Sequence, residues 1–140
     1  ELSRRITETK YYNNICLDHP ASIADYYMET LRHERREHLM LCMFDSKCHL
    51  LSDKLVSVGS VDASIVSPRE IFRFALACDA VHLVILHNHP SGIPDPSAAD
   101  DAVTERIYEC GKIMGIHLSD HIIIGDRTYY SYREKNRIVV

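Results

Sequence analysis

Residues 81–100 have the sequence VHLVILHNHPSGIPDPSAAD, and this stretch decides both the expected fold and the expected chemistry. Its first six residues form an apolar run interrupted only by His82, which is typical of a strand buried inside a sheet. Two further histidines, His87 and His89, follow two positions apart, so on an extended chain their side chains point to the same side. We therefore expect a buried strand that ends in two neighbouring imidazoles.

A serine and an aspartate complete the pattern. Ser97 and Asp100 have the spacing of a capping box, with Asp in place of Glu, so we expect a helix to begin after Ser97. Asp100 then lies in the first turn of that helix, close to the end of the strand. Imidazole nitrogens and carboxylate oxygens are zinc ligands, and three protein ligands leave one tetrahedral position for water. The pattern predicts one catalytic zinc ion held by His87, His89 and Asp100.

A simpler interpretation stays open for each half of this pattern. The chain has nine histidines, so a His-x-His pair has a fair chance of arising without a metal. The pair Ser97 and Asp100 is explained by helix capping alone.

The remaining sequence predicts strands that alternate with helices. Ser67-Pro68-Arg69-Glu70 has a serine cap, proline at the first helical position and glutamate at the third, and Gly115 is a typical helix end. The expected elements are a short edge strand within 5–17, a helix over 23–33 capped by Ser22, a hairpin of strands 39–44 and 48–58, a helix from 67 to about 78, a strand over 81–87, a helix over 98–114 and a closing hairpin of 116–124 and 127–133. This order predicts an α/β fold with a mixed sheet covered by helices.

Composition sets limits on the class of protein. A chain of 140 residues is expected to form one domain over residues 1–140. No apolar run is long enough to span a bilayer and no signal peptide is visible, so we expect no membrane partner. Five widely spaced cysteines are expected to be reduced thiols of a cytoplasmic protein. The formal net charge of −4 argues against a surface that binds nucleic acid through its phosphates.

Several motifs carry a family resemblance. The pattern His87-x-His89-x(7)-Ser97-x-x-Asp100 resembles the signature of the JAMM (MPN/JAB) metalloprotease superfamily. The phrase from His87 to Gly92 with Pro96-Ser97, together with Ser67-Pro68-Arg69-Glu70 upstream and Asp120-His121-Ile122-Ile123-Ile124-Gly125 downstream, resembles its bacterial RadC branch. The resemblance covers about residues 20–135. It implies a three-layer α/β/α fold with a mixed central sheet (JAB/MPN, cytidine deaminase-like), which these metalloproteases share with the zinc deaminases.

The resemblance also implies two catalytic residues. The superfamily has a glutamate just before its first core strand, where this chain has Glu37, and that glutamate acts as the general base. Glu34 is the competing candidate, although it is expected to lie still on the helix, and both are otherwise solvated surface acids. Ser97 resembles the serine that steadies the oxyanion of the tetrahedral intermediate. Asp120 and His121 are either outer partners of the zinc ligands or a structural pair.

The expected function is a zinc-dependent hydrolase that cleaves a peptide or isopeptide bond, with a peptide or protein as substrate. One alternative is a DNA-repair-associated factor that processes nucleic acid, because the RadC branch carries a DNA-repair name. Longer members have an N-terminal helix-hairpin-helix region, and we expect residues 1–140 to contain no such region. The other alternative is a non-catalytic interaction module. The residues leave open the substrate, the oligomeric state and what precedes Glu1.

Overall fold

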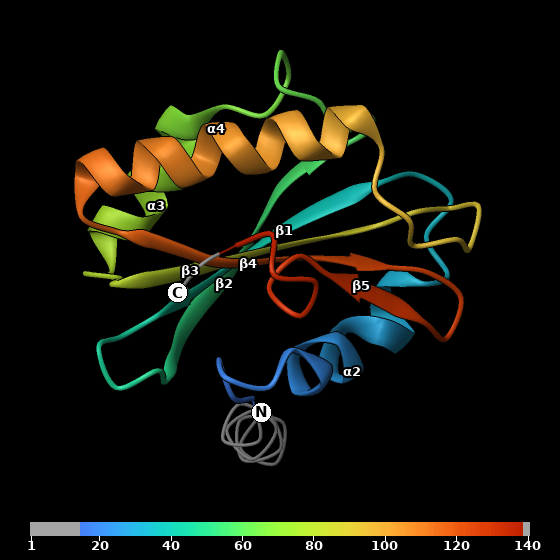
Figure 1. The fold of residues 1–140 in the computed structure, drawn as a ribbon, viewed down its shortest axis with the longest axis horizontal. Coiled ribbons are helices and arrows are strands. Elements are labelled where there is room, and N and C mark those ends of the chain that lie inside the picture. The colour runs from blue at the N-terminus through green and yellow to red at the C-terminus, as the bar shows by residue number, and fades with distance from the viewer. Residues whose placement is uncertain (1–14, 139–140) are drawn as a thin grey trace, which may run out of the picture.

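The computed structural model describes residues 15–138, in which a five-stranded mixed sheet is covered by helices (Figure 1). The sheet order is β2-β1-β3-β4-β5, and only the β3–β4 pair is parallel. The elements, in chain order, are α2 (Pro20–Leu31), β1 (His38–Phe44), β2 (Leu50–Val58), α3 (Pro68–Ala77), β3 (His82–Asn88), α4 (Ala98–Met114), β4 (His117–Ile124) and β5 (Tyr129–Ser131). The predicted α/β fold with a mixed sheet is confirmed.

The helices form a layer on each side of the sheet. Helices α3 and α4 cover one face and α2 covers the other (Figure 1). Side chains alternate along a strand, so each buried strand contributes to both layers. Leu83 and Ile85 of β3 pack in the cluster under α3 and α4, whereas Val84 and Leu86 pack in the cluster against α2. This double burial explains why β3 is an apolar run rather than an alternating one.

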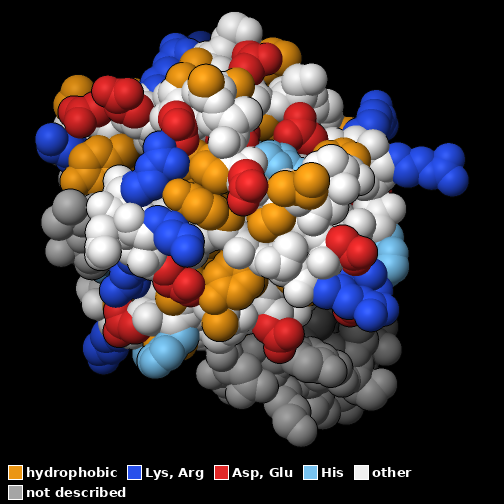
Figure 2. Space-filling model, turned by 45° about the vertical axis from the view of Figure 1, so that its right-hand side comes forward, with side chains coloured by type: hydrophobic (Ala, Val, Ile, Leu, Met, Phe, Trp, Pro, Cys, Tyr) orange, Lys and Arg blue, Asp and Glu red, His pale blue; other side chains and the backbone are white. Residues whose placement is uncertain are grey.

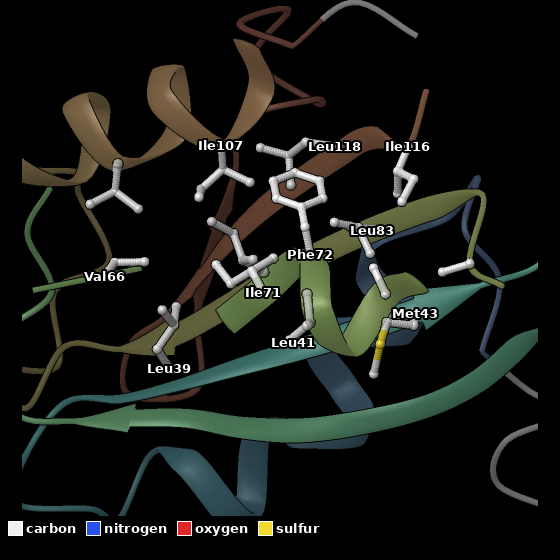
Figure 3. Packing of buried hydrophobic residues seen from close by; sticks show 14 of the residues in the cluster. Leu39, Leu41, Met43, Val66, Ile71, Phe72, Leu83, Ile107, Ile116 and Leu118 are labelled. Carbon is white, nitrogen blue, oxygen red and sulfur yellow. The ribbon is translucent and has the colours of Figure 1, made fainter. Parts of the chain in front are cut away.

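The larger of the two clusters lies between the sheet and the helices α3 and α4 (Figure 3). Ile71 and Phe72 of α3 and Ile107 of α4 meet Leu41 and Leu118 of the sheet there. Full burial of a side chain of this size stabilises a fold by about 1.5–3 kcal/mol relative to exposure. The sheet and α4 therefore form a firm support for groups placed at their ends.

Two helix starts follow the sequence signals. Ser67 caps α3 by accepting a hydrogen bond from the Glu70 amide, and Ser97 caps α4. Helix α4 spans residues 98–114 as predicted, and Gly115 ends it with a left-handed φ of 72°.

The predicted start of α2 is wrong. The helix begins at Pro20, and Ser22 lies inside its first turn rather than at its cap. Pro20 explains the difference, because proline has the φ of a helix and lacks the amide hydrogen that a first-turn residue leaves unpaired. The Ser22 hydroxyl donates to the His19 carbonyl and accepts from the Cys16 amide.

The closing hairpin is also shorter than predicted, since β5 covers only residues 129–131. Polar side chains replace the ladder beyond it. The Arg133 amide donates to Asp120 Oδ1, and the Glu134 amide donates to Ser131 Oγ. The predicted edge strand over 5–17 lies almost entirely outside the described residues, and residues 15–17 are not in a strand.

No helix between residues 15 and 138 combines the length and the apolarity that a membrane span requires.

Candidate metal centre

Strand β3 delivers the two motif histidines to one place. His87 is fully buried near the end of β3, and His89 follows just after it. The His89 amide donates to the Ile124 carbonyl at 2.9 Å, which keeps the chain extended beside β4 for one residue more. Both imidazoles consequently point to the face of the sheet that α4 covers, and their Nε2 atoms lie 3.1 Å apart.

The first turn of α4 brings Asp100 to the imidazoles. Ser97 Oγ accepts a hydrogen bond from the Asp100 amide, and Asp100 Oδ2 accepts one from the Ser97 amide at 2.9 Å. This capping box fixes the direction of the carboxylate, whose Oδ1 lies 3.1 Å from His87 Nε2 and whose Oδ2 lies 3.0 Å from His89 Nε2. The two interpretations of the Ser–Asp pair are therefore compatible: one aspartate caps the helix and faces both histidines.

The spacing of these atoms fits a small tetrahedral cation. Zinc–nitrogen and zinc–oxygen bonds of 2.0–2.2 Å place neighbouring tetrahedral ligands about 3.3 Å apart. The donor atoms of His87, His89 and Asp100 lie 3.0–3.1 Å from one another. In addition, His89 Nδ1 donates to the Ile93 carbonyl at 2.9 Å, so the lone pair of a neutral His89 lies on Nε2 and faces the cluster.

The electrostatics of the cluster favour positive charge. The hydrogen bond that the Asp100 carboxylate accepts from protonated His89 is the main cause that raises the pKa of His89. Burial acts to raise the pKa of the Asp100 carboxyl, but the contacts of its oxygens with His87 Nε2 and His89 Nε2 outweigh it and hold that pKa well below its usual range. The side chains at this spot thus stabilise a cation between them.

Glu37 lies beside the cluster and slightly farther away. Its Oε1 is 3.9 Å from His87 Nε2 and 4.0 Å from His89 Nε2, and its Oε2 accepts a hydrogen bond from the Val61 amide. These distances exceed the spacing of tetrahedral ligands and suit a carboxylate that contacts a water molecule at the fourth position. Glu34, the competing base, is instead 3.6 Å from His38 Nε2 and lies outside the four-residue group of Glu37, His87, His89 and Asp100.

Asn88 holds the segment that carries Glu37. It lies between the two histidines in sequence, so its side chain points to the opposite face of the sheet and is buried. Its Oδ1 accepts from the His38 amide at 2.7 Å, while its Nδ2 donates to the carbonyls of Arg36 and Glu34. The end of strand β3 therefore presents the imidazoles on one face of the sheet and anchors the chain around Glu37 from the other.

Two buried side chains, His121 and Thr104, form a chain of polar contacts behind His87. His121 is therefore an outer partner of a candidate ligand, which is one of the two roles that the sequence left open. His121 Nε2 lies 2.9 Å from His87 Nδ1, and His121 Nδ1 lies 2.5 Å from Thr104 Oγ1. Sequence reasoning missed Thr104, although its position four residues after Asp100 places both on one face of α4.

Asp120 belongs to a different group. It accepts hydrogen bonds from the Ser131 hydroxyl and from the amides of His121 and Arg133. Burial raises its pKa to about 6 in spite of these bonds. Its neighbour His121 therefore contacts the cluster, whereas the Asp120 carboxylate secures the end of the sheet.

The Ser97 hydroxyl keeps a proton that the capping box does not use. The side chain is solvent-exposed, and its oxygen acts as an acceptor in the capping box. Within residues 15–138, Ser97 donates through its amide and accepts through Oγ, and its hydroxyl proton has no acceptor. Capping and donation to an oxyanion are therefore compatible, because they use different atoms of the hydroxyl.

Comparison with known proteins places this arrangement in a family. The family model of the RadC-like JAB domain matches residues 17–137. A UPF0758 protein of Bacillus cereus strain B4264 is 42% identical over 138 residues, which are 99% of this chain and 61% of that protein. UPF0758 proteins of Bacillus mycoides strain KBAB4 and Bacillus thuringiensis subsp. konkukian strain 97-27 are each 41% identical over the same shares.

The chain spans about three fifths of the length of the curated relatives it matches. The match nevertheless covers all elements from α2 to β5, including Glu37, His87, His89 and Asp100. The chain belongs to the family of RadC-like JAB domains.

Proposed function

We propose that this domain is a zinc-dependent hydrolase of the JAMM type that cleaves a peptide or isopeptide bond. The observation that carries the proposal is the convergence of three donor atoms, from His87, His89 and Asp100, at mutual distances of 3.0–3.1 Å, with the Glu37 carboxylate 3.9–4.0 Å from the two imidazoles. Two neutral imidazoles and one carboxylate are the ligand set of a zinc ion that keeps a position for water.

The side chains have separate tasks in such a reaction. His87, His89 and Asp100 would hold a zinc ion, which would supply the Lewis acidity that polarises a carbonyl and acidifies water. Glu37 accepts the proton of the attacking water and passes it to the leaving amine. Its carboxylate is partly exposed and is held by the Val61 amide, so it reaches solvent and keeps one orientation. The Ser97 hydroxyl donates a hydrogen bond to the developing oxyanion.

The charge distribution favours a peptide over nucleic acid as substrate. The face shown in Figure 2 has lysine and arginine side chains interspersed with acidic ones, rather than one continuous basic field. Several cations are also paired locally, as in the ion pairs of Arg32 with Glu29 and Asp126. A protein that binds phosphates in a series needs unpaired cations along one surface.

The test of this proposal is metal analysis followed by an activity screen. Protein purified without chelators or added metal should contain close to one zinc per chain, and the His87→Ala/His89→Ala variant should contain none. The zinc-loaded domain and a full-length relative should then be assayed on peptide, isopeptide-linked and DNA substrates. Full zinc occupancy in the double variant would exclude the site, and turnover of DNA alone would exclude the peptide substrate.

A further inference from the structure

His121 contacts the buried side of His87, and its ring is held in one orientation. It is fully buried on β4, and its Cα lies opposite that of Ile85 in the parallel β3–β4 pair. It therefore shares a face with Ile85 and His87, two residues farther along β3. Its ring stacks on Tyr132, with the centroids 4.9 Å apart and the planes within 5°. These contacts hold the His121 ring in one orientation.

The hydrogen bonds assign the direction of every proton in the relay. The Thr104 hydroxyl donates its single proton to the Asp100 carbonyl at 2.8 Å, so toward His121 Nδ1 its oxygen acts as an acceptor. His121 Nδ1 must then bear the hydrogen, which leaves Nε2 of the neutral ring as an acceptor. Consequently His87 donates its Nδ1–H across the 2.9 Å contact with His121.

This direction has a consequence at the other nitrogen of His87. A neutral imidazole with a hydrogen on Nδ1 has a lone pair on Nε2. That lone pair faces Asp100 Oδ1 at 3.1 Å and His89 Nε2 at 3.1 Å, and His89 is in the same tautomer because it donates to Ile93. With both imidazoles neutral, three acceptors face one another with no proton between them, so a cation bound between them would stabilise the arrangement.

We propose that His121 is a positioning residue: with Thr104 it fixes His87 in the tautomer whose Nε2 binds the metal ion, and metal affinity depends on it although it does not contact the ion. The inference rests on the proposed metal site. A metal-bound histidine usually donates its other N–H to a carboxylate, a carbonyl or water. Here the acceptor is an uncharged imidazole rather than a third carboxylate. The carboxylates of Asp100 and Glu37 alone then balance the two positive charges of a divalent cation.

The first experiment measures zinc affinity by competition with a chromophoric chelator, on metal-free protein whose fold is verified by circular dichroism. His121→Phe keeps a ring that stacks on Tyr132 and removes the acceptor, so its affinity should fall about 10- to 100-fold. His121→Gln restores an acceptor near the position of Nε2 and should recover most of the loss. His82→Phe is the matched control, because His82 lies on β3 at the far end from the cluster and bonds Ser119; it should bind zinc as the wild type does.

The second experiment reads the tautomers directly, by long-range ¹H–¹⁵N correlation of the imidazoles in the zinc-loaded wild type. His87 and His121 should both have the hydrogen on Nδ1. Thr104→Val removes the acceptor for His121 Nδ1–H at nearly constant volume, so it should shift the His121 tautomer and weaken zinc binding. This variant also serves if His121→Phe does not fold.

The outcomes separate this inference from the proposed function. A wild type that binds no zinc would exclude the metal site and the inference together. A wild type that binds zinc, with unchanged affinity in His121→Phe or, if that variant does not fold, in Thr104→Val, would refute the role of His121 alone. A hydrogen on Nε2 of His121 in the zinc-loaded protein would refute it as well.

Discussion

At the scale of single residues, the site depends on side chains that use several atoms for different tasks. Asp100 accepts from the Ser97 amide and faces two imidazoles, and Glu37 accepts from the Val61 amide with one oxygen while the other points to the cluster. The hydrogen bond of one oxygen fixes the direction in which the other oxygen of the same carboxylate points. Binding, positioning and chemistry are therefore best separated by substitutions that change a single atom or group of the side chain.

Glu37→Gln is the smallest change that removes the proposed base. The carboxamide has nearly the same size but does not accept a proton, so zinc content should stay near one per chain while turnover falls by about 100-fold or more. Metal analysis and kcat on a substrate found in the screen provide the measurement. Glu34→Gln is the matched control and should keep turnover. Loss of zinc in Glu37→Gln would instead show that Glu37 is a metal ligand.

Ser97 is best tested with two replacements, because its capping and its donation use different chemistry. Ser97→Ala should lose about 1 kcal/mol of unfolding free energy, whereas Ser97→Gly should lose only a few tenths, since glycine is tolerated at an N-cap. Both variants lack the hydroxyl and should lose about 100-fold in turnover. Chemical denaturation and kcat measure the two effects. Wild-type turnover in Ser97→Gly would show that Ser97 acts only as the helix cap.

Asp120 gives the molecule a pH dependence that is independent of catalysis. Its pKa is raised from 3.8 to about 6 by burial, so the folded protein holds this proton more tightly than the unfolded chain. The stabilisation approaches about 3 kcal/mol well below pH 4 and is lost as the pH rises through 6. An asparagine side chain does not titrate, so the unfolding free energy of Asp120→Asn minus that of the wild type should rise by about 2 kcal/mol between pH 4 and pH 7. A constant difference in metal-free protein would contradict the assignment.

At the scale of elements, the end of β3 organises the site through the alternation of its side chains. His87 and His89 face α4 and Asn88 faces the opposite layer, where it bonds to the chain between Glu34 and His38. One strand end thus presents two candidate metal ligands and holds the segment of the proposed base. The first turn of α4 adds the third ligand because the capping box fixes where that turn begins.

Asn88→Leu should release the segment around Glu37 and leave the zinc ligands in place. The replacement removes three hydrogen bonds to backbone groups, and each backbone group left unsatisfied costs about 1–3 kcal/mol. We expect retained zinc binding, faster hydrogen exchange at the His38 amide and lower turnover. Asn88→Asp is the matched control, because it keeps the acceptor for the His38 amide. Undiminished exchange protection of His38 in Asn88→Leu would show that other contacts hold the segment.

At the scale of the whole molecule, apolar clusters on both sides of the sheet support the site, and Figure 3 shows the one under α3 and α4. The domain has enough buried apolar surface to fold without an ion, unlike a small zinc finger, in which the metal supplies the folding energy. The proposed zinc ion therefore adds to an existing fold.

Removal of zinc should lower the melting temperature without unfolding the domain at 25 °C. Free zinc at about 1,000 times its Kd stabilises the folded state by about 4 kcal/mol relative to metal-free protein. Differential scanning calorimetry with and without a chelator measures the shift. The His87→Ala/His89→Ala variant should melt at the same temperature in both conditions. A metal-free wild type without a cooperative transition would mean that the ion is structural.

The sequence by itself determined the features that depend on neighbouring residues. The apolar run of β3, the spacing of His87 and His89, and the capping of α3 and α4 each follow from strand alternation or from helix-end chemistry. They predicted the α/β fold and the three candidate ligands. The start of α2 is equally local, because Pro20 begins the helix and Ser22 lies inside its first turn.

Only the tertiary structure decided which distant residues meet. Glu37 and Val61 approach the cluster from other elements, and Asn88 bonds to a segment 50 residues away in the chain. The contact between His87 and His121 depends on the register of the parallel β3–β4 pair, which is set by the packing of the whole sheet. Local patterns specify what each element is, whereas the distances between elements follow from how all the apolar faces pack together.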